Sequence, residues 1–237
     1  MKIKGLKTDE EFKSTLRQVL DELESTIINE LDTKQGKILT YWLNDWNELF
    51  LKKEKQFNPK ELLKYKRGNI VKAHLGYNIG SEQGGLHYGI VMDINNSKTS
   101  NILTIIPLRS LEENESEESI DKRFEVFLGK ALLTDKIKYT EGKIRDINRK
   151  LEGMKKGTSE YNKTIRQKNN NIRELKNLNK GSVAIVSQIR TISKMRVYEP
   201  LQSYHSLSKF VLDDDNMKEI EKLISKLYIK SVDQIEG

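Results

Sequence analysis

The stretch NIGSEQGGLHYGIVMD, residues 78–93, decides how the chain is expected to fold. It opens as a polar, glycine-containing loop that carries Ser81 and Glu82, and His87 stands where the loop passes into the apolar run 89–92. Paired glycines suit tight turns, and a short apolar run bounded by turn residues is typical of a buried strand. The stretch therefore predicts a strand that begins with titratable side chains beside a loop.

Four further runs have the same strand-like character and surround this stretch in the sequence. They are short and rich in β-branched residues. They cover residues 69–75, 101–108, 124–128 and 182–189, and the central strand itself extends over 87–94. Their spacing predicts a small sheet in the second part of the chain, interrupted by a long segment without strand character.

The first part of the chain, residues 8–64, has a helical pattern. Apolar residues recur every three or four positions, at Phe12, Leu16, Val19, Leu23, Ile27 and Leu31. Thr8 and Glu11 have the spacing of a capping box, and Gly36 is expected to break the first helix. A second helix is expected to follow and to end near Asn58–Pro59.

Aromatic residues gather on one face of that second helix, at Tyr41, Trp42, Trp46 and Phe50. Such side chains can stack on nucleic-acid bases. Aromatic residues at helical spacing more commonly belong to a hydrophobic core, and we favour that interpretation. We expect these helices to pack around the sheet domain or its dimer.

The segment 130–180 is predicted to form an inserted helical hairpin. Apolar residues recur at heptad distances, at Ile137, Ile144, Leu151, Ile165 and Ile172, and Gly153 interrupts the pattern near its middle. Two antiparallel helices of about 20 residues each satisfy this pattern. We expect the hairpin to project, so that replacing residues 134–178 by a short turn leaves a folded protein. A last amphipathic helix is expected after Asp213–Asp215.

Charge is distributed unevenly along the 237 residues. The formal net charge is +7, but 15 Lys/Arg face only 6 Asp/Glu between Gly129 and Lys180, a local net of +9 that leaves −2 for the remainder. A basic segment favours a polyanionic partner. The hairpin can therefore track RNA or a ribosomal surface, although excess lysine is also common on a plain solvated helix.

Composition also narrows the cellular setting. The chain has no cysteine, which excludes disulfides and thiolate metal sites. No apolar run approaches the roughly 20 residues that cross a bilayer, and the N-terminus lacks the apolar core of a signal peptide. We expect a cytoplasmic protein without a membrane partner, divided into a helical extension over 1–64 and an α+β domain over 65–237 that the hairpin interrupts.

Three separated segments carry a resemblance to a known family. They are KRGNIVKAHLGYNIGSEQGGLHYGIVMD (66–93), TIIPLRS (104–110) and GSVAIVSQIRTISKMRV (181–197). Their motifs and their order resemble the MazF/PemK family of toxin ribonucleases. The resemblance covers residues 66–128 and 181 to about 228, and it includes neither the N-terminal helices nor the hairpin.

The resemblance implies a small, strongly bent β-barrel of the SH3-like, gyrase-inhibitor type that forms a homodimer. Members of this family cut single-stranded RNA without a metal or other cofactor, and leave a 2′,3′-cyclic phosphate and a 5′-hydroxyl. An antitoxin protein blocks the RNA groove with an acidic segment. These properties are expectations for this chain.

Two positions depart from the family pattern. The family usually has an arginine where this chain has His87, and a threonine or serine where it has Arg109, whereas the loop with Glu82 is kept. The arginine of this chain thus stands at the second of two positions that are expected to face one pocket, whereas in the family it stands at the first.

Metal-free RNA cleavage needs a base for the 2′-hydroxyl, an acid for the leaving oxygen and a cation beside the phosphate. His87 suits acid–base work because imidazole titrates near pH 6.5. Arg109 suits the cationic role, and Glu82 can transfer a proton or orient His87. The predicted catalytic set is therefore His87, Arg109 and Glu82. The predicted RNA contacts are Ser81, Gln83, Ser110 and Arg190, and no metal site is predicted.

Structural interpretations remain open beside the catalytic ones. His87 can be a packing residue, Arg109 can pair with the acidic run 112–118, Glu82 can be solvated, and Arg190 can be scaffold. The same fold can serve a non-catalytic module that clamps a topoisomerase, or an adaptor that recruits a partner through the hairpin. Convergence of His87 and Arg109 on one concave surface favours the enzyme.

Overall fold

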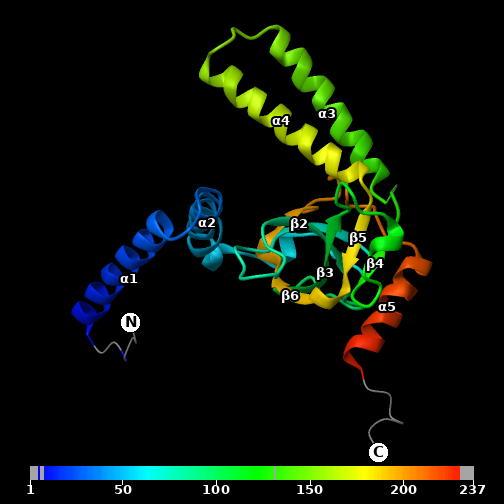
Figure 1. Ribbon diagram of the computed structural model, residues 1–237, viewed down its shortest axis with the longest axis horizontal. Helices are drawn as coiled ribbons and strands as arrows, with labels where there is room; N and C mark the ends of the chain where they lie inside the picture. Colours follow the sequence, from blue (N-terminus) through cyan, green and yellow to red (C-terminus); the bar gives the residue numbers. More distant parts are fainter. Residues whose placement is uncertain (1–4, 6–7, 131, 230–237) are drawn as a thin grey trace, which may run out of the picture. The chain divides into compact units, whose positions relative to one another are not determined.

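The computed structural model describes residues 5, 8–130 and 132–229, and Figure 1 shows its helices and strands. The chain divides into two compact units, Met1–Gln56 and Phe57–Gly237. No helix in the described part of the chain is both long and apolar enough to span a membrane.

The first unit is helical and contains α1 (Asp9–Asn29), α2 (Thr33–Asp45) and a π-helical turn, Trp46–Leu51. Both halves of the predicted capping box are present between Thr8 and Glu11. The predicted break at Gly36 is wrong, because α2 begins at Thr33 and Gly36 is buried within it. A Cβ on Gly36 would lie 3.1 Å from the carbonyl oxygen of Ile27, so glycine permits α1 and α2 to approach closely.

The apolar stripe of this unit is largely uncovered. None of the residues of α1 is buried, and in α2 only Gly36 is. Trp42 and Phe50 make a ring contact with centroids 5.8 Å apart, but Tyr41 is 72% exposed. Trp46 is also exposed, at 44%, so the interpretation of the aromatic run as a hydrophobic core is wrong for Tyr41 and Trp46.

The second unit is built on one antiparallel sheet. Its strands are β1 (Ile70–His74), β2 (Leu86–Val91), β3 (Ile102–Ser110), β4 (Glu125–Phe127), β5 (Ser182–Ile185), β6 (Arg190–Ser193) and β7 (Val197–Glu199). The order is β4-β5-β3-β2-β1-β7, and β6 pairs with β3. The α+β class and the antiparallel sheet agree with expectation, but no described pairing joins β4 to β7, so closure into a barrel is not seen.

The sheet bends along β3, the longest strand. Residues 108–110 of β3 pair with β5, whereas residues 102–105 pair with β6. A 3₁₀ turn, Val186–Gln188, separates β5 from β6. The predicted strand 182–189 is therefore two features, a strand that ends at Ile185 and a turn, and the short strands β6 and β7 were not predicted.

Both faces of the sheet are buried, as alternation along the strands requires. One core cluster contains Ile70, Ile90 and Ile106. The other contains their neighbours in the strands, Val71, Val91 and Ile105. The first cluster also contains Met217 and Ile220 of α5 (Asp214–Tyr228), which begins with Asp213 as its N-cap. The C-terminal helix thus forms where its sequence predicts and covers one face of the sheet.

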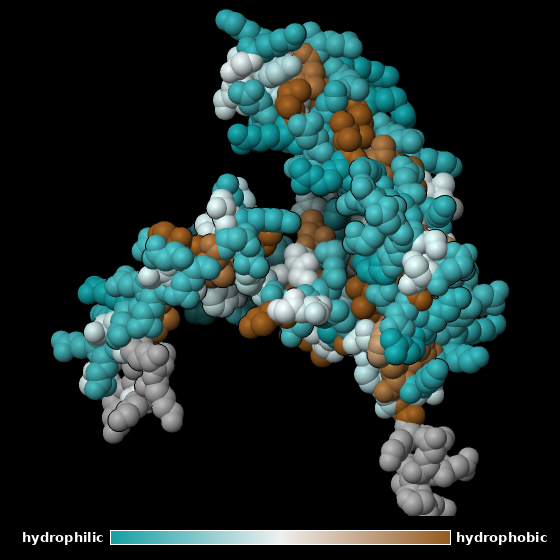
Figure 2. All heavy atoms as spheres, viewed as in Figure 1, coloured by the Kyte–Doolittle hydropathy of each residue, from teal (hydrophilic) through white to brown (hydrophobic). Residues whose placement is uncertain are grey.

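The insertion forms two packed helices, α3 (Thr134–Glu152) and α4 (Ser159–Asn179), that extend away from the sheet (Figure 1). Figure 2 shows that their visible surface is mainly hydrophilic. Ile172 is 45% exposed, although it was expected at the apolar seam. The base of the hairpin is not separable from the domain, because Leu133 and Leu178 belong to the same core cluster as β1, β2 and α5.

Candidate active site

A cavity opens where β2 and β3 separate. Their pairing runs from Val91↔Ile105 to Gly89↔Pro107, and the same register continued would place His87 opposite Arg109. Both residues instead line a cavity of about 210 Å³. The two positions at which the chain departs from the family pattern therefore converge on one concave surface.

The wall facing the sheet comes from the inserted hairpin. Arg173, Glu174 and Asn177 of α4 line the cavity together with Lys72 of β1 and Tyr88 of β2. None of these five residues was predicted from the sequence. Three of them come from α4 and the other two from β1 and β2, so no local motif connects all five.

His87 is half-buried, and two neighbours fix its imidazole. Its Nδ1 lies 3.2 Å from the carbonyl oxygen of Leu108, which can only accept, so Nδ1 carries the hydrogen. The side-chain nitrogen of Gln83 lies 2.8 Å from Nε2 and 2.9 Å from Nδ1, and with the hydrogen on Nδ1 it donates to Nε2. Burial lowers the pKa of His87, the Leu108 hydrogen bond opposes this, and the charge of Lys72 lowers it further. The imidazole is therefore neutral at pH 7, with its basic lone pair on Nε2.

The loop before β2 is held from behind by Gln188 and Arg190. Gln188 accepts from the backbone N–H of Gln83 (2.6 Å) and donates to the carbonyl oxygen of Ser81 (3.0 Å). Arg190 donates to the carbonyl oxygen of Gln83 (3.1 Å) and to the side-chain oxygen of Gln188 (3.0 Å). Arg190 therefore orients Gln83, which in turn touches His87.

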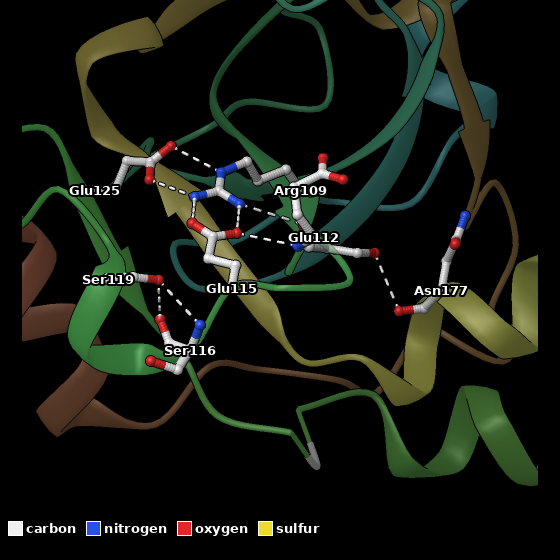
Figure 3. A network of polar contacts seen from close by, with 8 residues as sticks. Arg109, Glu112, Glu115, Ser116, Ser119, Glu125 and Asn177 are labelled. Carbon is white, nitrogen blue, oxygen red and sulfur yellow. Dashed lines mark hydrogen bonds and ion pairs between the residues drawn. The ribbon is translucent and has the colours of Figure 1, made fainter.

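Arg109 is clamped between two glutamates, as Figure 3 shows. Its Nε and Nη2 donate to Glu125 (2.8 and 2.6 Å), and its Nη1 and Nη2 donate to Glu115 (both 2.6 Å). Nη1 also donates to the carbonyl oxygen of Ser110 (3.3 Å). All five guanidinium hydrogens have acceptors, so a phosphate would have to displace a carboxylate. The alternative in which Arg109 pairs with the acidic run is the arrangement found.

The hydrogen bonds among Arg109, Glu115 and Glu125, here called the Arg109 clamp, shift the pKa values of Arg109 and Glu115. The hydrogen bonds that Arg109 donates to Glu125 and Glu115 raise its pKa. The hydrogen bond from Arg109 lowers the pKa of Glu115 to about 2. Glu115 is therefore ionised near neutral pH, where its negative charge offsets the positive charge of Arg109.

A second charged cluster joins the sheet to the hairpin. Lys72 Nζ lies 2.5 Å from Glu174 Oε1, and the hydroxyl of Tyr88 donates to the same oxygen at 2.6 Å. Burial disfavours the charge on Glu174, but the hydrogen bonds from Lys72 and Tyr88 outweigh it and lower its pKa. Burial, and then the charge of Glu174, raise the pKa of Tyr88. Glu174 is thus ionised and Tyr88 protonated.

Arg173 is the cation that the cavity leaves available. It is exposed on α4 and lines the cavity with His87. Within the described residues, 5, 8–130 and 132–229, it forms no hydrogen bond or ion pair. The sequence does not single it out, because Arg173 lies 86 residues from His87, inside a segment with the pattern of a plain basic helix.

The remaining predicted residues divide between the cavity and the loop. Ser110 lines the cavity, and its hydroxyl donates to the carbonyl oxygen of Asn177 at 3.0 Å. Ser81 and Glu82 are exposed on the loop and are not among the residues that line the cavity. In the described part of the chain, no three His, Asp or Glu side chains are placed to hold a metal ion.

Comparisons with known proteins add a weak structural likeness. No protein-family model matches the sequence, and no curated protein matches it significantly. A solved structure that is similar is the crystal structure of MazF (Form-I) from Deinococcus radiodurans, with a TM-score of 0.38 and 14% identity, covering 70% of this chain and 96% of that chain. A likeness at this level does not establish a shared fold or function.

Proposed function

We propose that the chain is a metal-independent endoribonuclease of the MazF/PemK type, which cleaves single-stranded RNA by attack of a 2′-hydroxyl on the adjacent phosphate. The observation that carries this proposal is the neutral imidazole of His87 in a cavity that also contains Arg109 and an available cation, Arg173. The strand and loop that hold His87 are also the segment in which the resemblance to the family is densest.

His87 is the base in this reaction. The 2′-hydroxyl of the RNA replaces the Gln83 amide as the hydrogen-bond donor to Nε2. Nε2 then takes the hydroxyl proton as O2′ forms its bond to phosphorus. The bond from phosphorus to O5′ then breaks, and the proton held by His87 is available to the departing O5′. A proton-transfer group of this kind contributes about 10²–10⁴-fold to the rate.

Arg173 takes the cationic role that the sequence suggested for Arg109. The charge of Arg109 is already balanced by Glu115 and Glu125. An arginine without a carboxylate partner can bind two phosphate oxygens at once and stabilise the charge that develops on them. We propose no role for Glu82 in proton transfer, because it is exposed and does not line the cavity.

The wider role follows the same resemblance. We infer a cytoplasmic toxin that acts as a homodimer and is neutralised by an antitoxin protein. Arg173 beside the cavity suits an acidic antitoxin segment as well as RNA, because both present anionic oxygens. Co-purification of the two proteins from a common operon would test this part.

The experiment is incubation of the purified protein with mixed-sequence RNA in EDTA, followed by analysis of the fragment ends. We expect 2′,3′-cyclic phosphate and 5′-hydroxyl ends, and at least a tenfold loss with His87→Ala. His205→Asn is the control, because His205 Nδ1 accepts only from the backbone of Leu201 and Asn can replace that acceptor. Activity that vanishes in EDTA and returns with Mg²⁺ would contradict the proposal.

A non-catalytic binding module is the second candidate. One observation favours it: Gln83 occupies the His87 Nε2, so the basic lone pair is not free in this conformation. If intact protein cuts no RNA but binds a protein target through the cavity, and His87→Ala leaves that binding unchanged, this alternative is correct.

A further inference from the structure

A groove adjoins the cavity and runs between the hairpin and the sheet edge. Its volume is about 700 Å³, and it shares Lys72, Leu86 and Glu174 with the His87 cavity. The groove continues past Tyr198 and Glu199 of β7 and along the inner faces of α3 and α4. The two hollows therefore adjoin at the ion pair between Lys72 and Glu174, and a chain-like ligand that fills both passes over this pair.

The carboxylates of the groove are already paired. Glu174 binds Lys72, Glu199 binds Lys136, and Asp146 lies 3.5 Å from Arg149. None of the three presents an uncompensated negative charge to a ligand.

Two lysines of the groove are available. Lys143 and Lys150 are exposed on α3, and neither forms an ion pair with another residue of the described chain. Lys143 rests over the ring of Tyr139, with Nζ 4.6 Å from the ring centroid. Seven residues separate the two lysines, which places them on one face of the helix about 10 Å apart.

The facing helix supplies amides and β7 supplies an aromatic ring. Gln167, Asn170 and Asn171 of α4 line the groove, and Tyr198, which is 65% exposed, lines it from the sheet. Amides can both donate to and accept from base edges, and an exposed tyrosine can stack on a base.

We propose that this groove is an extended RNA-binding site, in which the strand leaving the His87 cavity continues over the inner face of the hairpin. Lys143 and Lys150 bind backbone phosphates, and the amides with Tyr198 contact the bases. The inference rests on the proposed function for the identity of the ligand. It assigns to the insertion, which lies outside the resemblance to the family, a part in substrate binding.

The test compares two double variants with the same loss of charge. Lys143→Gln/Lys150→Gln removes the groove lysines. Lys138→Gln/Lys156→Gln removes two exposed lysines of the hairpin that do not line the groove. Each pair is introduced into a His87→Ala background, and binding of a fluorescein-labelled, mixed-sequence RNA of about 20 nucleotides is measured against salt concentration.

We expect weaker RNA binding for the groove variant alone. Each phosphate neutralised on a single strand contributes about −0.7 to the slope of log K against log salt, so losing two contacts makes the slope shallower by about 1.4. The control variant keeps the parent slope. The loss in affinity is larger for the 20-nucleotide RNA than for one of about 5 nucleotides.

The outcomes separate this inference from the proposed function. Equal slopes for the two double variants overturn the groove inference, even if His87-dependent cleavage is confirmed. A shallower slope for the groove variant supports the groove inference, even if wild-type protein proves unable to cleave RNA. Retention of RNA binding by the groove variant with loss of an acidic protein partner overturns it in favour of a protein-docking site.

Discussion

Lys72 of β1 and Glu174 of α4 form an ion pair across the junction between the sheet and the inserted hairpin, with Nζ 2.5 Å from Oε1. Their side chains are 14% and 21% exposed. Tyr88 donates to the same carboxylate oxygen. The insertion is therefore bound to the sheet at the edge of the His87 cavity, and the wall that carries Arg173 has a defined position.

The first prediction removes the negative charge of this junction. Glu174→Gln leaves the half-buried ammonium of Lys72 without its anion, and removing one partner of a fully buried pair costs about 3–5 kcal/mol. With partial exposure, we expect a loss of about 2 kcal/mol in the free energy of unfolding, measured by urea denaturation. Glu113→Gln is the control, because Glu113 and its partner Lys176 are 70% and 67% exposed, and little change is expected. Equal effects of both substitutions would contradict the assignment of the junction.

The second prediction concerns pH. Burial lowers the pKa of His87 below its usual 6.5, so the folded protein keeps the neutral base at pH values where a free imidazole is protonated. Cleavage should rise with pH through a midpoint below 6.5 and then remain level. The contribution of His87 to folding stability is present above pH 6.5 and is lost as pH falls through the folded pKa, because the unfolded chain binds the proton first. A midpoint above 6.5 in kcat/KM would exclude His87 as the base in this environment.

The third prediction separates the Arg109 clamp from catalysis. Arg109→Leu leaves Glu115 and Glu125 facing one another without a cation and should destabilise the fold by about 3 kcal/mol. Adding Glu115→Gln and Glu125→Gln should recover most of that loss, because no unpaired charge remains. This triple variant should retain measurable cleavage, whereas Arg173→Ala should reduce cleavage at least tenfold. Full activity of Arg173→Ala would return the cationic role to Arg109.

The Arg109 clamp should also make the folding stability depend on pH in the acid range. The pKa of Glu115 falls from 4.5 to about 2 on folding, so its stabilisation is present above pH 4.5 and is lost as pH falls toward 2. Thermal denaturation between pH 2 and pH 5 should show this loss in wild-type protein. It should be smaller in the triple variant, which has no carboxyl group at position 115, whereas the loss from other carboxyl groups with a lowered pKa, such as Glu174, remains.

Short sequence patterns correctly predicted the helices and strands whose formation depends on residues close together in the chain. The capping box at Thr8 and the acidic start at Asp213 mark helices that begin at those residues. The β-branched run 69–75 predicted the strand β1, and the structure places its Ile70 and Val71 in the two core clusters. The prediction at Gly36 was wrong because a glycine in a helical pattern can permit close packing of two helices as well as end a helix. Only the position of Ile27 in the structure distinguishes these two roles.

The site was predictable only in part, since its parts are distant in sequence. The resemblance placed His87 and Arg109 at one surface, and both line the cavity. It could not supply the partners of Arg109, because Glu125 lies 16 residues away and approaches only when β4 pairs with β5. Arg173 was hidden for the same reason: the docking of α4 on the sheet depends on Lys72, which is 102 residues from Glu174.

The last prediction separates the two ends of the hairpin. Replacing residues 149–167 by a short glycine-containing turn removes the distal part and keeps Lys136, Glu174 and Leu178. Replacing 134–178 removes the ion-pair partners of Glu199 and Lys72 and a core leucine that is 6% exposed. A buried leucine alone contributes about 2–5 kcal/mol. We therefore expect the distal deletion to unfold in urea near the wild-type midpoint.

The full deletion should lose at least about 3 kcal/mol, because it combines the loss of Leu178 with the loss of two ion pairs. It also removes Arg173, so any protein that folds should cleave RNA at least tenfold more slowly. The distal deletion should keep cleavage and lose the part of long-RNA binding that Lys150 and Gln167 supply. Equal stability and equal cleavage for the two deletions would mean that the hairpin is an independent arm, and that the sheet forms the active site without it.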